Sequence, residues 1–201
     1  MQYLKDEVRN SIVEEALKQF KELGFKASSI RGIAKNSGTS VGNIYKYFDS
    51  KEDIYENLIG SVYHKLMDYI KQFDQVELNE KAEVIFYGLM EKILEIFNEN
   101  STEISILLNK SNGAKYEDCK NDFVQFITRI VTETMKYELS LQGKILKDNF
   151  IIYLVSNSLV ESIAIILENR EESSEVRKLI LNLIDIFFTD MKNKLDSEIL
   201  E

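Results

Sequence analysis

The sequence predicts an all-α protein, and three observations support this fold class. The 201 residues include no proline and only eight glycines, so few residues would interrupt a helical backbone. Leu, Ile, Glu and Lys are abundant, and this composition favours helix. Apolar residues also recur at steps of three and four, the spacing of one helix face. The hydrophobic content of 44% is ordinary for a globular core.

The first predicted helix ends near Gly24, because a glycine commonly stops a helix. Phe25, directly after the stop, is expected to return to the core. One face of this helix carries apolar residues at helical spacing, namely Val8, Ile12, Ala16, Leu17 and Phe20.

Two short helices are predicted next. Ser29 is expected to cap the first of them and Gly38 to end it. The second begins at a hydroxyl cap, either Thr39 or Ser40, and continues to about Phe48. The buried face of the first short helix is expected to hold Ile30, Ile33 and Ala34.

A fourth helix is predicted from Ser50 to about Phe73, with Asp53 placed like the acid of a capping box. Polar or glycine-containing segments separate it from five further helices and bring the predicted total to nine. These five span residues 80–98, 102–110, 116–141, 147–169 and 174–195. No apolar stretch is expected to approach the roughly 18 residues that a membrane span needs.

Charge is distributed unevenly along the chain. The net charge is -9, but the first 51 residues hold nine basic and six acidic side chains and carry +3, so the remainder carries -12. This asymmetry indicates one module that meets a polyanion and a second that repels it. We therefore expect two domains, one of residues 1–50 that meets a polyanion and a larger helical domain of residues 51–201.

The two short helices and the turn "NSGTS" form a predicted helix-turn-helix unit. Val41, Ile44 and Phe48 share one side of its second helix and are expected to be buried. Small, hydrogen-bonding and aromatic side chains then remain exposed, a set that suits insertion into a DNA major groove. This set consists of Thr39, Ser40, Gly42, Asn43, Tyr45, Lys46 and Tyr47.

The segment from Ile12 to Ile59, and within it "SIRGIAKNSGTSVGNIYKYFDSKEDI", resembles the DNA-binding domain of the TetR family of bacterial transcriptional regulators. The resemblance covers about a quarter of the chain. It implies a homodimeric repressor of operator DNA whose second domain binds a small-molecule effector and controls the separation of the two DNA-binding segments.

The same resemblance assigns roles by position. Ser29 and Arg31 lie where the family contacts phosphate or base. The base-proximal positions are Val41, Gly42 and Asn43, and the phosphate-binding positions are Tyr45, Tyr47 and Lys51. Val41 is apolar where many relatives are polar, so it either contacts a thymine methyl group or packs inside the protein.

Aromatic and methionine side chains are numerous in the second half of the chain. Within such a helical bundle the family builds a ligand cavity, and these side chains suit an apolar or cationic molecule. The candidate lining residues are Met67, Phe86, Tyr87, Met90, Phe123, Phe126, Tyr153 and Asn157. The last two predicted helices are the expected dimer contact. The helix of residues 147–169 is apolar over most of its circumference and is kept narrow by Ser156, Ser158 and Ser162, and the helix of residues 174–195 carries Leu179, Leu183, Ile186, Phe187 and Met191.

Other classes of function fit the sequence less well. The only histidine, His64, has no Glu-x-x-His partner motif, and one cysteine, Cys119, cannot complete a zinc site. We therefore expect no cofactor, no metal and no catalysis. A ligand- or pH-sensing role of His64 and a redox-sensing role of Cys119 stay open. A helical histidine without a special task is favoured for the first, and the nearby acids Glu117, Asp118 and Asp122, which disfavour the thiolate, favour a structural role for the second. The alternatives left open are a regulator controlled by a protein partner, one without an inducer, and an all-helical enzyme. The unpaired cysteine and the charged N-terminus favour the cytoplasm.

Overall fold

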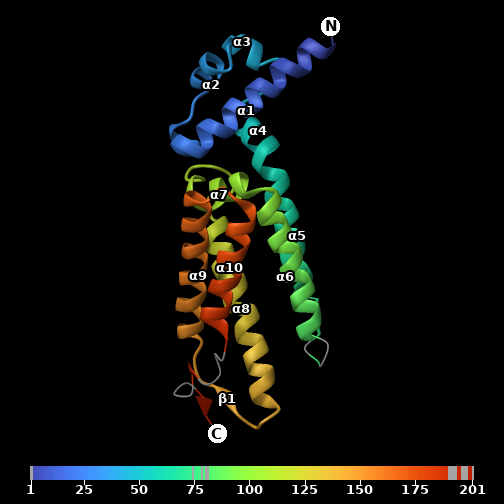
Figure 1. The fold of residues 1–201 in the computed structure, drawn as a ribbon, viewed down its shortest axis with the longest axis vertical. Helices are drawn as coiled ribbons and strands as arrows, with labels where there is room; N and C mark the ends of the chain where they lie inside the picture. The colour runs from blue at the N-terminus through green and yellow to red at the C-terminus, as the bar shows by residue number, and fades with distance from the viewer. Residues whose placement is uncertain are drawn as a thin grey trace. The chain divides into compact units, whose positions relative to one another are not determined.

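A computed structural model describes residues 2–73, 75–77, 79, 82–189, 194–195 and 199–200, with the side chains of residues 2–5 and 82–87 excepted (Figure 1). The described chain is helical almost throughout, which confirms the predicted all-α class. Its α-helices are α1 (Gln2–Ala27), α2 (Ile30–Asn36), α3 (Val41–Ile44), α4 (Lys51–Tyr55), α5 (Ser61–Phe73), α6 (Ala82–Glu99), α7 (Ser101–Asn109), α8 (Cys119–Ser140), α9 (Phe150–Asn169) and α10 (Ser173–Phe188).

Three elements depart from the prediction. The predicted fourth helix is divided by a π-helical segment, η1 (Glu56–Gly60), which lies between α4 and α5. Two strands of two residues each also form, β1 (Ile145–Leu146) and β2 (Ile199–Leu200), and they pair antiparallel. The sequence pattern could not predict these strands, because each has only two residues and is defined by backbone pairing with a segment far away in the sequence.

The chain divides into two compact units. Unit 1 comprises residues 1–65 and 100–117, and unit 2 comprises residues 66–99 and 118–201. Unit 1 therefore extends beyond residue 50 and includes α7 with the turns that follow it. The division into a DNA-binding domain of residues 1–50 and a ligand-binding and dimerisation domain of residues 51–201 stays a prediction.

Unit 1 is built around the buried faces of α1, α2, α4 and α7. Three rings pack at its centre, since Tyr55 lies 5.4 Å from Phe20 and 5.0 Å from Phe25 between ring centroids. Phe25 is thus in the core, as expected.

Gly24 interrupts the regular helix of α1, as predicted, and α1 continues beyond it only across a kink. Its φ of 78° lies in the left-handed region that favours glycine, and helical structure resumes and continues to Ala27. The kink turns the Phe25 amide toward the segment after α7, where it donates a hydrogen bond of 2.9 Å to the carbonyl of Lys110. One glycine therefore helps to join the two chain segments of unit 1.

Unit 2 is a helical bundle in which α9 packs against α8 and α10, and α10 also packs against α6. Near the β1–β2 pair it contains a separate apolar cluster of buried residues, namely Met135, Leu139, Leu146, Ile152 and Leu195. The helix predicted from residue 116 begins instead at Cys119, and the one predicted from residue 147 begins at Phe150, after β1.

Helix α9 is long and apolar enough to cross a membrane by length and composition, which contradicts the expectation that no segment would be. Its hydrophobic positions serve packing instead: residues on one side of it are buried against α8 and α10 inside unit 2. Ile152, Leu159 and Ile163 are among these buried residues. A core helix of a globular bundle passes the same compositional test, so α9 is weak evidence for a membrane.

Candidate nucleic-acid interface

The α2–turn–α3 segment is organised by side-chain caps. Ser29 accepts a hydrogen bond of 3.1 Å from the amide of Gly32 and caps α2, as predicted. Of the two possible caps of α3, Ser40 has this role, since its Oγ accepts the amide of Asn43 at 3.1 Å. Gly38 has a φ of 69°, so the left-handed conformation explains the glycine in the turn.

Helix α3 is anchored by its apolar side. Ile44 and Phe48 are buried, as expected, whereas Val41 is only half-buried. The helix itself ends at Ile44, earlier than predicted, and residues 45–47 form a turn. Arg9 of α1 stacks its guanidinium 5.3 Å from the centroid of the Phe48 ring and donates a hydrogen bond to Asn57 at 3.0 Å.

The outward side of this segment holds the side chains expected to contact DNA. Tyr45, Lys46 and Gly42 are exposed, and Tyr47 is half-buried. Asn43 is held in place, because its Nδ2 donates a hydrogen bond of 2.8 Å to the Thr39 hydroxyl. Arg31 and the cap serines Ser29 and Ser40 are exposed on the same short segment of chain.

Gly42, unlike Gly38, does not adopt a left-handed backbone conformation. Its backbone is helical, and a Cβ placed on it would find nothing within 4 Å among the described residues. Neither conformation nor internal packing therefore requires a glycine at this position.

Lys51 makes contacts inside the protein that sequence reasoning did not predict. Its ammonium donates to the carbonyl oxygens of Phe25 at 2.7 Å and Ser28 at 3.1 Å, and it lies 4.2 Å from the centroid of the Phe25 ring. An ammonium has three N–H donors, so one remains for a phosphate beside these two bonds. The acceptors come from the end of α1, which the local sequence around Lys51 could not indicate.

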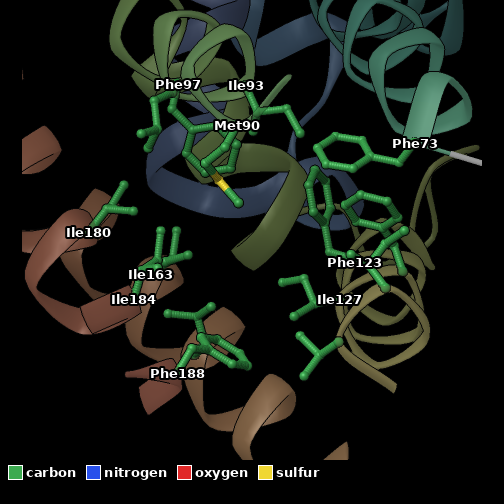
Figure 2. A pocket seen from close by; sticks show the side chains of 15 residues that line it. Phe73, Met90, Ile93, Phe97, Phe123, Ile127, Ile163, Ile180, Ile184 and Phe188 are labelled. Atoms are coloured by element: carbon green, nitrogen blue, oxygen red, sulfur yellow. The ribbon is translucent and has the colours of Figure 1, made fainter. Parts of the chain in front are cut away.

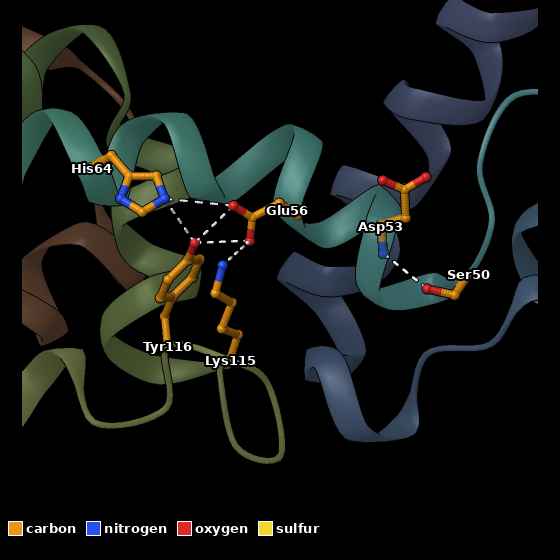
Figure 3. A network of polar contacts seen from close by, with 6 residues as sticks. All are labelled: Ser50, Asp53, Glu56, His64, Lys115 and Tyr116. Carbon is orange, nitrogen blue, oxygen red and sulfur yellow. Dashed lines mark hydrogen bonds and ion pairs between the residues drawn. The ribbon is translucent and has the colours of Figure 1, made fainter.

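A polar cluster centred on Glu56 was also not predicted (Figure 3). The Tyr116 hydroxyl donates to Glu56 Oε1 at 2.9 Å and Oε2 at 2.8 Å, and the Lys115 ammonium lies 3.1 Å from Oε2. His64 Nε2 lies 3.1 Å from the Tyr116 oxygen and 3.5 Å from Glu56 Oε1. Because the phenol has a single proton and Glu56 accepts it, a hydrogen bond between Tyr116 and His64 needs a proton on Nε2.

The electrostatics of this cluster follow from its contacts. Burial raises the pKa of Glu56, but hydrogen bonds from Tyr116 and Lys115 and the charge of Lys115 outweigh it and leave that pKa below the ordinary value. Burial and the bond to Glu56 raise the pKa of Tyr116. The cluster joins η1 and the first turn of α5 to the turn after α7, and its four residues all belong to unit 1.

Unit 2 contains an apolar cavity of about 200 Å³ (Figure 2). Three of the predicted ligand contacts line it, namely Met90, Phe123 and Phe126. Met67, Tyr153 and Asn157 are not among its lining residues, and the side chains of Phe86 and Tyr87 lie outside the described residues. The other lining residues, from α5, α6, α8, α9 and α10, are Phe73, Ile93, Leu94, Phe97, Ile127, Ile130, Val131, Leu159, Ile163, Ile180, Ile184 and Phe188.

Cys119 is buried at the start of α8. Burial, with a smaller contribution from the charge of Asp122, raises the pKa of its thiol to about 12. The thiol is therefore protonated at neutral pH, which makes it a poor nucleophile. Within the part of the chain that the structure describes, His, Cys, Asp and Glu residues form no group able to hold a metal ion.

Comparison with known proteins places these features in context. Residues 12–58 match the family model described as bacterial regulatory proteins, tetR family. The biofilm operon icaADBC HTH-type negative transcriptional regulator IcaR of Staphylococcus epidermidis is 20% identical over 145 residues, which are 72% of this chain and 76% of that protein. The protein of the same name from Staphylococcus aureus (strain Newman) is 27% identical over 89 residues, 44% of this chain and 47% of that protein.

Solved structures share the fold. A TetR-family transcriptional regulator from Bordetella parapertussis superposes with a TM-score of 0.65 at 15% identity, over 92% of this chain and 96% of that chain. The regulator PfmR from Thermus thermophilus gives a TM-score of 0.55 at 19% identity, over 90% and 95% of the two chains. At 15% and 19% identity, these two structures show that the chain shares their fold.

Proposed function

Because this chain belongs to the TetR family of bacterial transcriptional regulators, whose members bind DNA and are not enzymes, we propose that it is a repressor released from its operator by a small molecule. In this proposal α3 and the turn after it enter the DNA major groove, and the effector occupies the cavity of unit 2. The IcaR proteins are named as negative transcriptional regulators, which supports repression as the direction of control.

The observation that carries the DNA-binding assignment is the outward side of the α3 segment. Gly42 leaves room for a base edge to approach, and Asn43 presents an amide that the Thr39 hydroxyl holds in place. Tyr45 and Lys46 are exposed and suited to phosphate oxygens. We assign direct base contact to Val41, Gly42 and Asn43, phosphate contact to Tyr45, Tyr47 and Lys51, and contact with phosphate or base to Ser29 and Arg31.

We propose a homodimer formed through α9 and α10. Exposed apolar side chains on both helices support it, including Leu154 and Ile165 on α9 and Leu181 and Ile186 on α10. Ser158 and Ser162 keep the exposed side of α9 narrow, and each returns its hydroxyl to a carbonyl of its own helix. Leu179, Leu183 and Phe187 of α10 are half-buried and belong to the proposed contact, whereas Met191 lies outside the described residues.

A dimer would present two α3 segments to successive major grooves, about 34 to 36 Å apart on B-form DNA. A ligand that binds more tightly to the form with a different spacing lowers operator affinity by reciprocal linkage. A regulator of this kind must reach chromosomal DNA, which lies in the bacterial cytoplasm. We therefore assign the protein to the cytoplasm.

The decisive experiment is a selection of bound fragments from genomic DNA, followed by fluorescence anisotropy on the recovered sequence. The double variant Tyr45→Phe and Lys46→Ala should weaken binding to every sequence by roughly tenfold and reduce the slope of log affinity against log salt. Lys136→Ala, an exposed lysine of unit 2 paired with Glu133, is the matched control and should bind like the unchanged protein. Recovery of no fragment at low salt would overturn the proposal.

A further inference from the structure

We infer that the effector, or the part of it that enters unit 2, is a small uncharged hydrocarbon group that contacts only apolar side chains among the residues that the structure describes. This inference rests on the proposed function only in that the bound molecule is taken to control DNA binding. Binding in the cavity itself can be measured without DNA. It also narrows the expectation from the sequence, which left apolar and cationic molecules open.

The chemistry of the cavity wall carries the inference. Every residue that lines the cavity among the described residues is Phe, Met, Ile, Leu or Val, and these side chains offer no N–H or O–H group and no charge. A cation or carboxylate placed there would lose its hydration without gaining a partner, which costs far more than burial of the attached carbons returns. Figure 2 shows the lining side chains around the cavity, with Met90 extending toward its centre.

Ion pairs on the surrounding helices lie away from the apolar lining of the cavity. The ion pairs recorded on α6, α8, α9 and α10 join exposed or partly exposed groups, such as Arg177 with Glu91 and Lys120 with Glu161. None of these four side chains lines the cavity. A charged ligand would therefore find no counter-charge among those lining residues that the structure describes.

The volume limits the size of the ligand. A dry protein cavity of about 150 Å³ lined by Leu, Ile and Phe accepts benzene, so about 200 Å³ accepts a compact group of roughly eight to ten non-hydrogen atoms. A substituted benzene or a short branched aliphatic chain has this size. Met90 adds tolerance for shape, since its unbranched thioether adjusts to irregular ligands.

The partial burial of several lining residues is consistent with an unfilled space. Met90, Ile127, Ile130, Val131, Ile184 and Phe188 are only half-buried although all are apolar and line the cavity. Covering their remaining surface with a hydrocarbon would release water from apolar surface, which is the driving force for binding.

The test uses probes of matched shape and different charge on the purified full chain. Ethylbenzene and benzylammonium have the same number of non-hydrogen atoms, as do isopropylbenzene and benzoate. We expect the two hydrocarbons to raise the melting temperature and to give saturable binding by calorimetry. The two ions should bind at least about a hundredfold more weakly than their neutral counterparts.

Two variants locate the site. Ile184→Phe adds a ring to the wall of the cavity and should reduce hydrocarbon binding at least tenfold, while Leu23→Phe, an equivalent addition on the exposed side of α1, should leave it unchanged. Phe188→Leu enlarges the cavity and should shift the preference from ethylbenzene to butylbenzene, which keeps the test informative if the first variant folds poorly.

The outcomes separate this inference from the proposed function. Equal or tighter binding of benzylammonium or benzoate would overturn the inference, as would hydrocarbon binding that both cavity variants leave unchanged, or no binding of any probe. Hydrocarbon binding that follows the pattern above but never weakens the protein's hold on its selected DNA would support the inference and overturn release by a ligand.

Discussion

At the scale of single residues, two positions that are both expected to contact DNA differ in their contacts inside the protein. Gly42 is exposed, and a Cβ added to it would meet none of the described residues within 4 Å. Lys51, in contrast, bonds two carbonyl oxygens near the end of α1 and stacks on Phe25. Substitutions at these positions should therefore separate an effect on DNA binding from an effect on folding.

Gly42→Ala is predicted to leave the free energy of unfolding unchanged or to raise it by up to about 1 kcal/mol, because alanine is the better helix former. DNA affinity should nevertheless fall, since the added methyl group lies where a base edge approaches. Denaturant unfolding and fluorescence anisotropy measure the two quantities. Gly88→Ala in α6, where an added Cβ also meets none of the described residues within 4 Å, is the control and should not change DNA affinity.

Lys51→Ala is predicted to lower the free energy of unfolding by about 1 to 3 kcal/mol, because the carbonyls of Phe25 and Ser28 lose a partly buried charged donor. Urea titration would measure the loss, with the exposed Lys35→Ala as the comparison. A variant that unfolds like the unchanged protein and yet binds DNA weakly would show that Lys51 serves phosphate contact alone.

At the scale of elements, the segment 100–117 is part of unit 1 although the chain reaches it only after α6. Several contacts hold it there. The Tyr55 and Ser111 hydroxyls lie 2.6 Å apart, the Tyr63 and Tyr116 rings stack at 4.0 Å, and Glu56 accepts bonds from Tyr116 and Lys115. The π-helical segment η1 begins at Glu56, so the irregular part of the predicted fourth helix coincides with this attachment.

The Glu56 cluster is predicted to stabilise unit 1 in a pH-dependent way. The pKa of Glu56 is below its ordinary value of 4.5 in the folded chain, so its contribution is complete above that value and is lost as pH falls through the folded pKa. Glu56→Gln should therefore flatten the loss of melting temperature between about pH 5 and pH 3. The effect should be modest, since the Glu56 side chain is 39% exposed and water screens its partners.

Glu133→Gln provides the comparison for this measurement, because Glu133 forms an exposed pair with Lys136 on α8. It should keep the acid sensitivity of the unchanged protein. If Glu56→Gln and the unchanged protein lose melting temperature equally between about pH 5 and pH 3, the cluster does not contribute to the loss of stability in acid.

At the scale of the whole molecule, the chain passes between the two units three times, at residues 65–66, 99–100 and 117–118. In the proposed mechanism these crossings carry the effect of a ligand in unit 2 to the DNA-binding segment in unit 1. The other requirement at this scale is the dimer, because two linked DNA-binding segments bind far more tightly than one.

Ile186→Glu is predicted to produce a monomer with the mass of one chain, 23.4 kDa, because a charge would lie at the centre of the proposed apolar contact. DNA affinity should fall roughly a hundredfold or more with the loss of the second DNA-binding segment. Light scattering coupled to gel filtration measures the mass. Leu23→Glu places the same charge on an exposed leucine of α1 and should remain dimeric.

Local features of the chain could be predicted because their causes are local. Helices follow from propensity and apolar spacing, and the caps Ser29, Ser40 and Ser50 each bond an amide three residues ahead. The helix-turn-helix pattern and the family resemblance depend on the same short-range information. For this reason the fold class, the family and the outward side of α3 could be inferred before any coordinates.

Tertiary structure decided which residues from distant segments meet. Periodicity indicates that Met90, Tyr153 and Asn157 lie on helices, but only packing shows that Met90 lines the cavity and that the other two do not. It also brought Lys51 to the end of α1, and it joined Tyr116 to Glu56, 60 residues apart. Helical spacing determines which side chains share a face, whereas the partner of that face depends on the packing of whole helices.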